Sequence, residues 1–372
     1  MQTESFYVGK GDQADFIDVI HHFPVNATVG VLFMNGAGMV ANQLPPHFTA
    51  TMAKRFHITI WNYRGVANVH YFPKLEDVWS DVKLILKKSE LRKVQKVVLM
   101  GYSLGGVFAQ TMVADDRMRK LFAGFVLMAT TSSFVYDAYT TRFTGEKPPP
   151  PSLQLLQTVF GRRRVEKGQQ AEFIDGKPEA WSIVVLPKKP DKDRDWSEST
   201  LRFAERKMLW LFPPGMRTRI FFNRTPYHLL QTPGGPGNYS SRYLYLAQTL
   251  FMTKDFKVGE GPLAVSLAEA AKRAREDEVE EGARKPVLVI AGTQDGIFPL
   301  PVQIDLYKRV SAMPQLAVQG LFYADPLEVD LPSMRVQNIR HVHLEPASHA
   351  LFYQDNILMH LLCALTAFCE RV

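Results

Sequence analysis

Short apolar runs alternate with helix-like segments at both ends of this sequence, and that alternation restricts the fold more than any other feature. In the first third, the runs are rich in β-branched and aromatic residues, which favour strands, and the segments between them repeat apolar residues every three or four positions. The strands predicted there cover residues 15–23, 28–34, 56–62, 96–100 and 122–128, and the helices cover residues 75–88 and 104–114. Continuous apolar strands separated by helices are typical of α/β proteins, in which helices cover both faces of a mostly parallel sheet.

The alternation stops near Thr130 and resumes at Pro286. The block between them holds a run of prolines at 148–151 and amphipathic helix patterns at 196–212, 239–252 and 263–281. After it, strands are predicted at 286–291 and 339–345, and helices at 300–313 and 351–371. We therefore expect one α/β core, residues 1–131 and 285–372, interrupted by a mainly helical cap, residues 132–284.

Composition excludes several classes of protein. The 372 residues carry a net charge of +7, which is mildly basic and does not by itself indicate nucleic-acid binding. The two cysteines, Cys363 and Cys369, are too few for a disulfide scaffold, and their spacing places them on different faces of one predicted helix. No apolar run reaches the length of about 18 residues that a membrane span requires. The N-terminus lacks the basic and apolar regions of a secretory signal, so we expect a cytoplasmic protein.

Gly101, Ser103 and Gly105 form a G-x-S-x-G motif between a predicted strand and a predicted helix. A nucleophilic serine must stand on a sharp strand-to-helix turn, which strains its backbone and brings neighbouring chain very close. Glycine on either side removes the Cβ atoms that would clash. The alternative is a glycine-rich turn with an incidental serine, because the short motif occurs by chance.

A serine nucleophile needs a base, and the base needs an orienting acid. Asp295 follows the predicted strand 286–291, and His349 follows the predicted strand 339–345. The order serine, acid, histidine suits this architecture, and both residues follow strands at the edge where open α/β sheets place their sites. The alternatives are that Asp295 is a turn residue beside Gly296 and that His349 is a capping or solvated loop residue.

An oxyanion hole needs two backbone N–H groups. Leu104, directly after the serine, supplies one, and its helix N-terminus favours negative charge there. We expect the second from Ala37, in the loop that follows the strand 28–34, where Gly36 lets the backbone approach a substrate; an ordinary glycine turn is the alternative. The sequence contains no metal-binding or phosphate-binding motif in a suitable context, so we expect neither a metal ion nor a cofactor.

With these motifs the chain resembles the α/β-hydrolase superfamily, in the branch with a helical cap over the site. The resemblance rests on residues 101–105, on residues 292–295, on the context of His349, and on residues 62–65, which are similar to the family's D-x-R-G turn. Two positions depart from the family pattern. Asn35 stands where the family usually has histidine before glycine, and Asn62 stands where aspartate is usual.

The resemblance implies a serine hydrolase that forms an acyl-enzyme on Ser103 and cleaves an ester or thioester. Aromatic residues in the predicted cap favour an apolar or aromatic acyl group on a small-molecule or acyl-carrier-linked substrate. Two alternatives stay open: an aminopeptidase with the same triad, and a non-hydrolytic acyltransferase or ligand receptor. The basic run Arg162, Arg163 and Arg164 is either a solvated loop or a site for an anionic carrier phosphate. The oligomeric state is not predicted.

Overall fold

The computed structural model of the chain describes most of the predicted core. The described residues are 1–10, 14–24, 26–36, 39, 41, 44–65, 71, 73–132, 243, 246–247, 250, 261–276, 284–292, 295, 298, 300–323, 339–342, 351–353 and 355–372. The larger part of the predicted cap, including the basic run at 162–164, lies outside them.

Within the described residues, nine strands form one sheet in the order β1-β2-β4-β3-β5-β6-β7-β8-β9. The strands are β1 (Gln2–Val8), β2 (Asp15–His22), β3 (Val29–Met34), β4 (His57–Trp61), β5 (Lys96–Tyr102), β6 (Gly124–Met128), β7 (Lys285–Gly292), β8 (Leu316–Tyr323) and β9 (Ile339–Val342). Strand β2 is antiparallel to both of its neighbours, β1 and β4, and every pair from β4 to β9 is parallel. The predicted mostly parallel α/β sheet is therefore confirmed.

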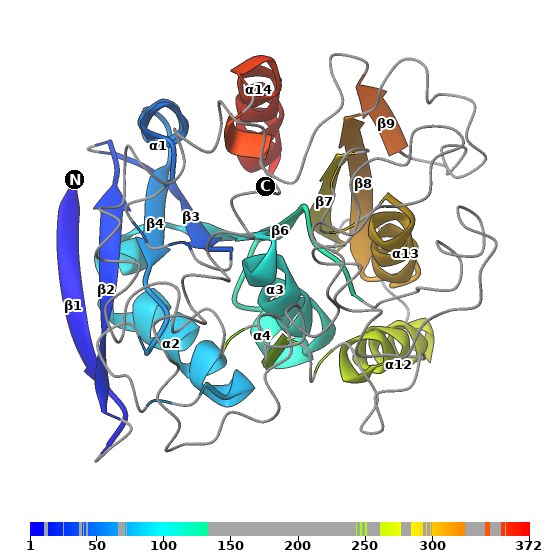
Figure 1. Ribbon diagram of the computed structural model, residues 1–372, viewed down its shortest axis with the longest axis horizontal. Coiled ribbons are helices and arrows are strands. Elements are labelled where there is room, and N and C mark those ends of the chain that lie inside the picture. The colour runs from blue at the N-terminus through cyan, green and yellow to red at the C-terminus, as the bar shows by residue number, and fades with distance from the viewer. Residues whose placement is uncertain are drawn as a thin grey trace, which may run out of the picture.

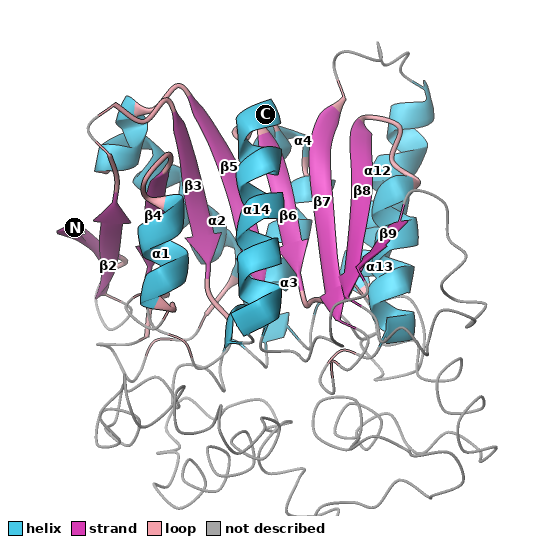
Figure 2. Ribbon diagram, turned by 90° about the horizontal axis from the view of Figure 1, so that it is seen from above, coloured by secondary structure: helices cyan, strands magenta, loops and turns pink. Residues whose placement is uncertain are grey.

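Helices cover both faces of this sheet (Figures 1 and 2). One face carries α1 (Pro46–Met52) and α14 (Asp355–Arg371), and the other carries α2 (Leu75–Lys88), α3 (Leu104–Ala114), α12 (Pro262–Glu276) and α13 (Leu300–Ser311). Shorter turns of helix are α4 (Asp116–Arg119), η2 (Glu90–Lys93) and η7 (Leu351–Tyr353). Successive residues of a strand point to opposite faces, so Leu32 and Met34 pack under α3 while Val31 and Phe33 pack under α1 and α14.

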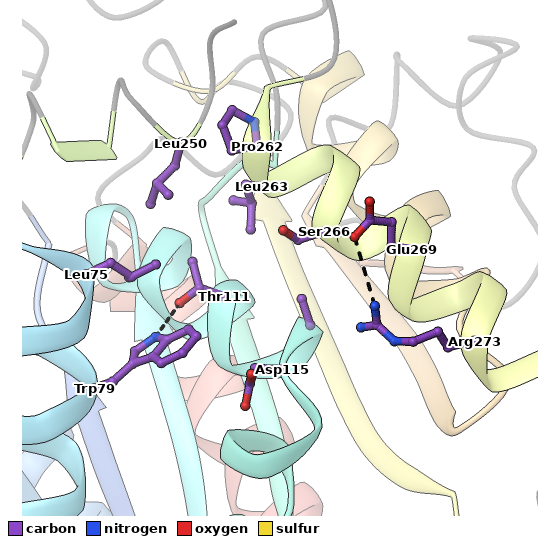
Figure 3. A pocket seen from close by; sticks show the side chains of 11 residues that line it. Leu75, Trp79, Thr111, Asp115, Leu250, Pro262, Leu263, Ser266, Glu269 and Arg273 are labelled. Atoms are coloured by element: carbon purple, nitrogen blue, oxygen red, sulfur yellow. Dashed lines mark hydrogen bonds and ion pairs between the residues drawn. The ribbon is translucent and has the colours of Figure 1, made fainter. Parts of the chain in front are cut away.

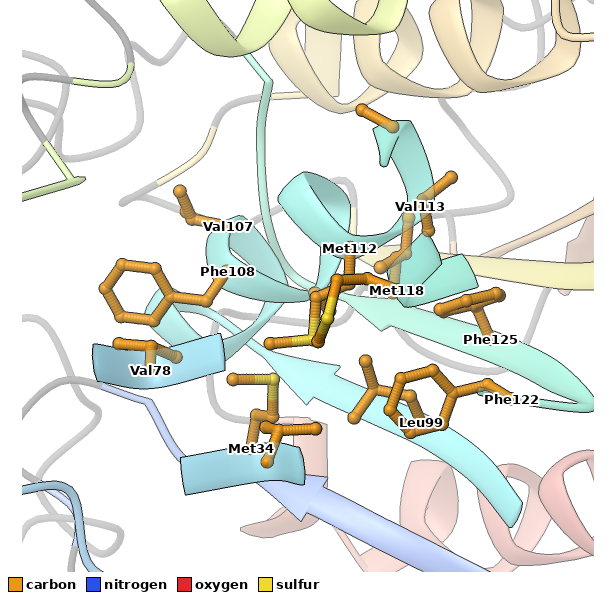
Figure 4. Packing of buried hydrophobic residues seen from close by; sticks show 14 of the residues in the cluster. Met34, Val78, Leu99, Val107, Phe108, Met112, Val113, Met118, Phe122 and Phe125 are labelled. Carbon is orange, nitrogen blue, oxygen red and sulfur yellow. The ribbon is translucent and has the colours of Figure 1, made fainter. Parts of the chain in front are cut away.

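Helix α3 is buried on all sides, which explains why its sequence is apolar without a polar face. All eleven of its residues are buried. Phe108 lies near Val78 of α2, and Met112 lies over Met34 and Leu99 of the sheet (Figure 4). Burying side chains of this size stabilises the fold by about 1.5–3 kcal/mol each. The helix that begins directly after Ser103 is therefore held firmly against the centre of the sheet.

Helix α12 belongs to the same layer. It lies inside the range predicted as the cap, yet it contacts α3 and α13, and Leu263, Leu267 and Ala270 are buried in the cluster that contains α3. The rest of residues 132–284 is almost entirely outside the described part of the chain. The division into core and cap therefore stays a prediction. None of the helices that the structure describes is both long and apolar enough to cross a bilayer.

Two strands were not predicted, and both departures have a physical cause. Strand β1 lies at the sheet edge, and most of its residues are exposed or half-buried, so it lacks an apolar run. Strand β8 places Gln319 and Gly320 in its middle, which interrupts the apolar pattern. Both strands pair through the backbone, and backbone pairing leaves little signal in composition.

A buried histidine pair joins β2 to β4. The Nε2 atom of His21 lies 3.1 Å from the Glu4 carboxylate, so it donates there and leaves Nδ1 as an acceptor. His57 Nε2 and Thr59 Oγ1 lie 2.9 Å and 3.0 Å from that Nδ1 atom. Burial, with His21 as a second cause, lowers the pKa of His57 to about 4. The pair is therefore neutral in the folded protein at neutral pH.

This pair predicts a loss of stability in acid. His57 has an ordinary pKa of about 6.5 when the chain is unfolded, so between pH 6.5 and pH 4 the unfolded state takes up a proton that the folded state does not. The contribution of His57 to the free energy of unfolding is therefore complete above pH 6.5. It decreases as the pH drops, by about 2 kcal/mol at pH 5. Urea unfolding at pH 7.5 and pH 5.0 measures this loss. The loss should be smaller in His57→Gln, and an equal loss in both proteins would contradict the assignment.

Candidate active site

Ser103 lies at the turn between β5 and α3, in a backbone conformation that an L residue rarely adopts. Its φ is 53° and its ψ is −119°. Its N–H donates to the carbonyl of Met128 at 2.9 Å, and its own carbonyl accepts from Gly106 at 3.0 Å. Such a conformation costs about 1–3 kcal/mol and persists only where the surroundings impose it. The strained serine predicted from the motif is present.

The two glycines of the motif are required by close backbone contacts. A Cβ atom on Gly105 would lie 2.1 Å from the carbonyl oxygen of Met34, at the end of β3. A Cβ atom on Gly101 would lie 2.7 Å from the carbonyl oxygen of Gly105. No side chain fits at either distance. The turn can therefore form only because glycine occupies both positions.

Gly36, which was predicted to support the oxyanion hole, lies directly beside Ser103. A Cβ atom added to Gly36 would lie 3.2 Å from the Cβ of Ser103 and 3.0 Å from the ring of Tyr102. On the other side, Leu104 is the first residue of α3, so its N–H has no acceptor within the helix. Ala37, the second predicted N–H donor, lies outside the described residues.

The segment of residues 35–41, which we call the oxyanion loop after its predicted role, is tied to the end of β4 and to the chain that follows it. Asn35 Nδ2 donates to the carbonyl of Trp61 at 2.9 Å, and the N–H of Ala41 donates to Asn62 Oδ1 at 2.8 Å. Tyr63 donates its hydroxyl to the carbonyl of Asn35 at 3.1 Å. The two asparagines that depart from the family pattern thus join the same two segments.

The hydrogen bond from Tyr63 to this loop was not predicted from the sequence. The only available signal was the position of Tyr63 within the turn at 62–65. That turn is also held by a buried charge network: Arg64 Nε donates to both carboxylate oxygens of Asp81, at 2.9 Å and 3.0 Å, and a second guanidinium nitrogen lies 3.1 Å from Asp77. These contacts fasten the chain after β4 to α2.

Asp295 lies three residues beyond the end of β7, and only 3% of it is exposed. Its Oδ1 accepts from the N–H of Phe298 at 2.8 Å, and Gln303 Nε2 lies 3.4 Å from its Oδ2. Asp295 therefore does shape a turn, as the alternative interpretation held. Its burial also fits a triad acid, so the catalytic role stays a prediction.

Strand pairing brings Ser103 and Asp295 to one edge of the sheet. Tyr102 pairs with Met128, and Met128 pairs with Ile290. At about 4.8 Å between neighbouring strands, the ends of β5 and β7 are about 10 Å apart, a gap that an imidazole and two hydrogen bonds would bridge. His349 lies outside the described residues, and the last described residue of β9 before it is Val342.

A groove of about 260 Å³ lies elsewhere, among α2, α3 and α12 (Figure 3). Its lining includes Trp79, whose indole N–H donates to Thr111 at 2.9 Å, and the pair Glu269 and Arg273, whose charged atoms lie 4.0 Å apart. It includes none of the predicted site residues. Within the described residues, no three His, Cys, Asp or Glu side chains gather in a way that could hold a metal ion.

Comparison with known proteins gives one kind of match. Neither a family model nor a curated protein sequence matches the chain. Solved structures do match over almost its whole length. A thermophilic esterase from Thermogutta terrifontis has a TM-score of 0.54 at 12% identity, with 100% of this chain and 99% of that chain covered. An esterase from Rhodococcus sp. ECU1013 has a TM-score of 0.52 at 13% identity, with 100% and 99% covered.

A hydrolase from Pseudomonas aeruginosa PA01 is similar to the same extent, with a TM-score of 0.50 at 13% identity and with 98% of this chain and 97% of that chain covered. Each of these three matches covers 98% or more of the chain. They confirm the resemblance inferred from the sequence: the chain has the fold of the α/β-hydrolase superfamily.

Proposed function

We propose that this protein is a serine hydrolase that cleaves an ester or thioester with the triad Ser103, His349 and Asp295. The observation that carries the proposal is the backbone of Ser103, with φ at 53° and ψ at −119° between β5 and α3. Strained backbone is concentrated at functional sites, and here the strained residue is a serine at the carboxyl edge of a parallel sheet. An incidental serine in a glycine turn would not need this conformation.

The proposed mechanism assigns one task to each group. His349 removes the Ser103 proton, and Oγ attacks the carbonyl carbon of the substrate. The N–H groups of Leu104 and Ala37 donate to the resulting oxyanion, while Asp295 orients the histidine and stabilises its charged form. His349 then protonates the leaving group. Water, activated by the same histidine, attacks the acyl-enzyme and releases the acid.

Three observations support an ester or thioester as the substrate class. The proposed donor Leu104 follows Ser103 directly, and Gly36, which precedes the other proposed donor Ala37, lies beside Ser103. Asp295 is buried at the same sheet edge. Two of the similar structures are esterases, at identities that support the fold alone. We further propose that residues 132–284 form a lid that selects an apolar or aromatic acyl group.

The first prediction concerns an activated serine. A fluorophosphonate probe should label the protein on Ser103, and Ser103→Ala should abolish labelling and turnover while the protein stays folded, because the nucleophile alone is removed. Mass spectrometry of the labelled peptide locates the adduct. Ser266→Ala, exposed on α12, is the matched control and should label normally. Labelling that survives in Ser103→Ala would overturn the proposal.

A substrate panel then separates the possible chemistries. We expect turnover of p-nitrophenyl esters or acyl thioesters, with release of the free acid. Faster cleavage of aminoacyl-arylamides would indicate an aminopeptidase instead. Transfer of the acyl group to an added alcohol or amine, with no free acid formed, would indicate an acyltransferase.

The second prediction tests Asp295 and His349. Asp295→Asn keeps an oxygen that accepts from Phe298, so the turn should survive while the histidine loses its orienting charge. We expect Asp295→Asn and His349→Ala each to lower kcat by about a thousandfold or more, and the double variant to cost little more than one. Steady-state kinetics measures this. Losses that simply multiply, or a mild effect of Asp295→Asn, would show that another carboxylate is the acid.

The third prediction separates strain from chemistry. Both Ser103→Gly and Ser103→Ala should be inactive, but glycine adopts a φ of 53° without strain, whereas alanine keeps the Cβ atom and with it the strain of the serine. We expect Ser103→Gly to be more stable than Ser103→Ala by about 1 kcal/mol in urea unfolding. Equal stability of the two variants would mean that the turn is relaxed in solution.

A further inference from the structure

Tyr63 is the link between the oxyanion loop and the rest of the core. Its hydroxyl donates to the carbonyl oxygen of Asn35 at 3.1 Å. The peptide unit is planar, so fixing that carbonyl also fixes the direction of the N–H of Gly36, on the opposite side of the same unit. Gly36 is in turn the loop residue that lies beside Ser103. One hydroxyl therefore orients the backbone next to the nucleophile.

The ring of Tyr63 is enclosed by aromatic side chains from three parts of the chain. It packs edge-on against Trp61 and Phe108, with ring centres 5.5 Å and 5.9 Å away, and lies tilted against Tyr243 at 4.9 Å. Tyr63 and Tyr243 are each 1% exposed. Tyr243 belongs to the block 132–284, so a residue from that block forms one wall around Tyr63.

Tyr243 is itself anchored by a directed chain of hydrogen bonds. The hydroxyl of Tyr71 donates to Asp77 at 3.0 Å, and Asp77 lies 3.1 Å from the Arg64 guanidinium. The hydroxyls of Tyr243 and Tyr71 are hydrogen-bonded to each other. Since Tyr71 has already given its only proton to Asp77, Tyr243 donates and Tyr71 accepts. Burial raises the pKa of Tyr243, so its hydroxyl keeps that proton.

We propose that Tyr63 is a positioning residue for the oxyanion hole, because it fixes the peptide unit that leads through Gly36 to the proposed donor Ala37, and that Tyr243 holds the ring of Tyr63 in place. This inference rests on the proposed serine hydrolase function. Tyr63 touches no reacting atom in this scheme. It acts through Asn35 and Gly36. Its hydroxyl should therefore lower the energy of the transition state, in which negative charge develops on the substrate oxygen, and should not affect substrate binding.

The test compares Tyr63→Phe with Tyr323→Phe. Each variant removes one buried tyrosine hydroxyl that forms a hydrogen bond, since the Tyr323 hydroxyl lies 3.1 Å from His360 Nδ1. With p-nitrophenyl butyrate, Tyr63→Phe should lower kcat about tenfold and change KM by less than about twofold. Its inhibition constant for phenylboronic acid, which forms a tetrahedral adduct on serine, should rise by the same factor. Tyr323→Phe should leave all three values within about twofold of wild type.

Thermal unfolding separates positioning from general stability. A merely structural role would lower the melting temperature similarly in both variants and would leave kcat and the boronate constant unchanged, and that result would overturn the inference. A wild type that neither labels with fluorophosphonate nor turns over the ester would overturn the proposed function, and this inference with it. A reactive wild type with an equally reactive Tyr63→Phe would overturn this inference alone.

A second variant tests the role of Tyr243. Tyr243→Phe keeps the ring but loses its hydrogen bond to Tyr71, so the ring against Tyr63 is less firmly oriented. We expect kcat to fall about two- to threefold in the wild-type background and to show no further fall in Tyr63→Phe. An equal fall in both backgrounds, or none in the wild type, would show that Tyr243 does not act through Tyr63.

Discussion

The contact between the first turn of α3 and the end of β3 is the constraint on which the rest of the site depends. A Cβ atom on Gly105 would lie only 2.1 Å from the carbonyl oxygen of Met34, so the two backbones meet with no side chain between them. β3 and β5 are neighbours in the sheet, so this contact requires the chain to turn at Ser103. The oxyanion loop, which begins where β3 ends, therefore lies beside the serine. The strain at Ser103 is offset by the burial of α3, whose residues are all enclosed.

A second layer of contacts supports this turn from the side of β4. Asn35, Asn62 and Tyr63 connect the oxyanion loop to the end of β4 and to the chain after it. The buried pair of Arg64 and Asp81 then fastens that chain to α2. A buried ion pair contributes little net stability, but removing one partner leaves an uncompensated charge, so it fixes a geometry more than it stabilises a fold. The position of the loop is thus set by several elements at once.

Local sequence patterns predicted a strand or helix correctly wherever its buried residues recur with the period of that element. The apolar runs predicted β2 to β7, and the helical spacing predicted α2 and α3, because each buries one continuous apolar surface. The edge strand β1 and the interrupted strand β8 were missed, since the hydrogen bonds that hold them come from neighbours distant in sequence. The motif around Ser103 was recognisable because its glycines answer a local steric requirement.

By itself, the sequence determined the fold class, the strained turn and the candidate serine and acid, since these depend on residue type within a few positions. Only the tertiary structure decided what surrounds them. Asn35 and Asn62 bridge the same two segments because β3 lies beside β4 in the strand order β4-β3-β5. Tyr243 packs on Tyr63 because the chain returns to this place after more than a hundred residues. Such contacts join residues far apart in sequence through the geometry of the whole sheet, and no local pattern encodes them.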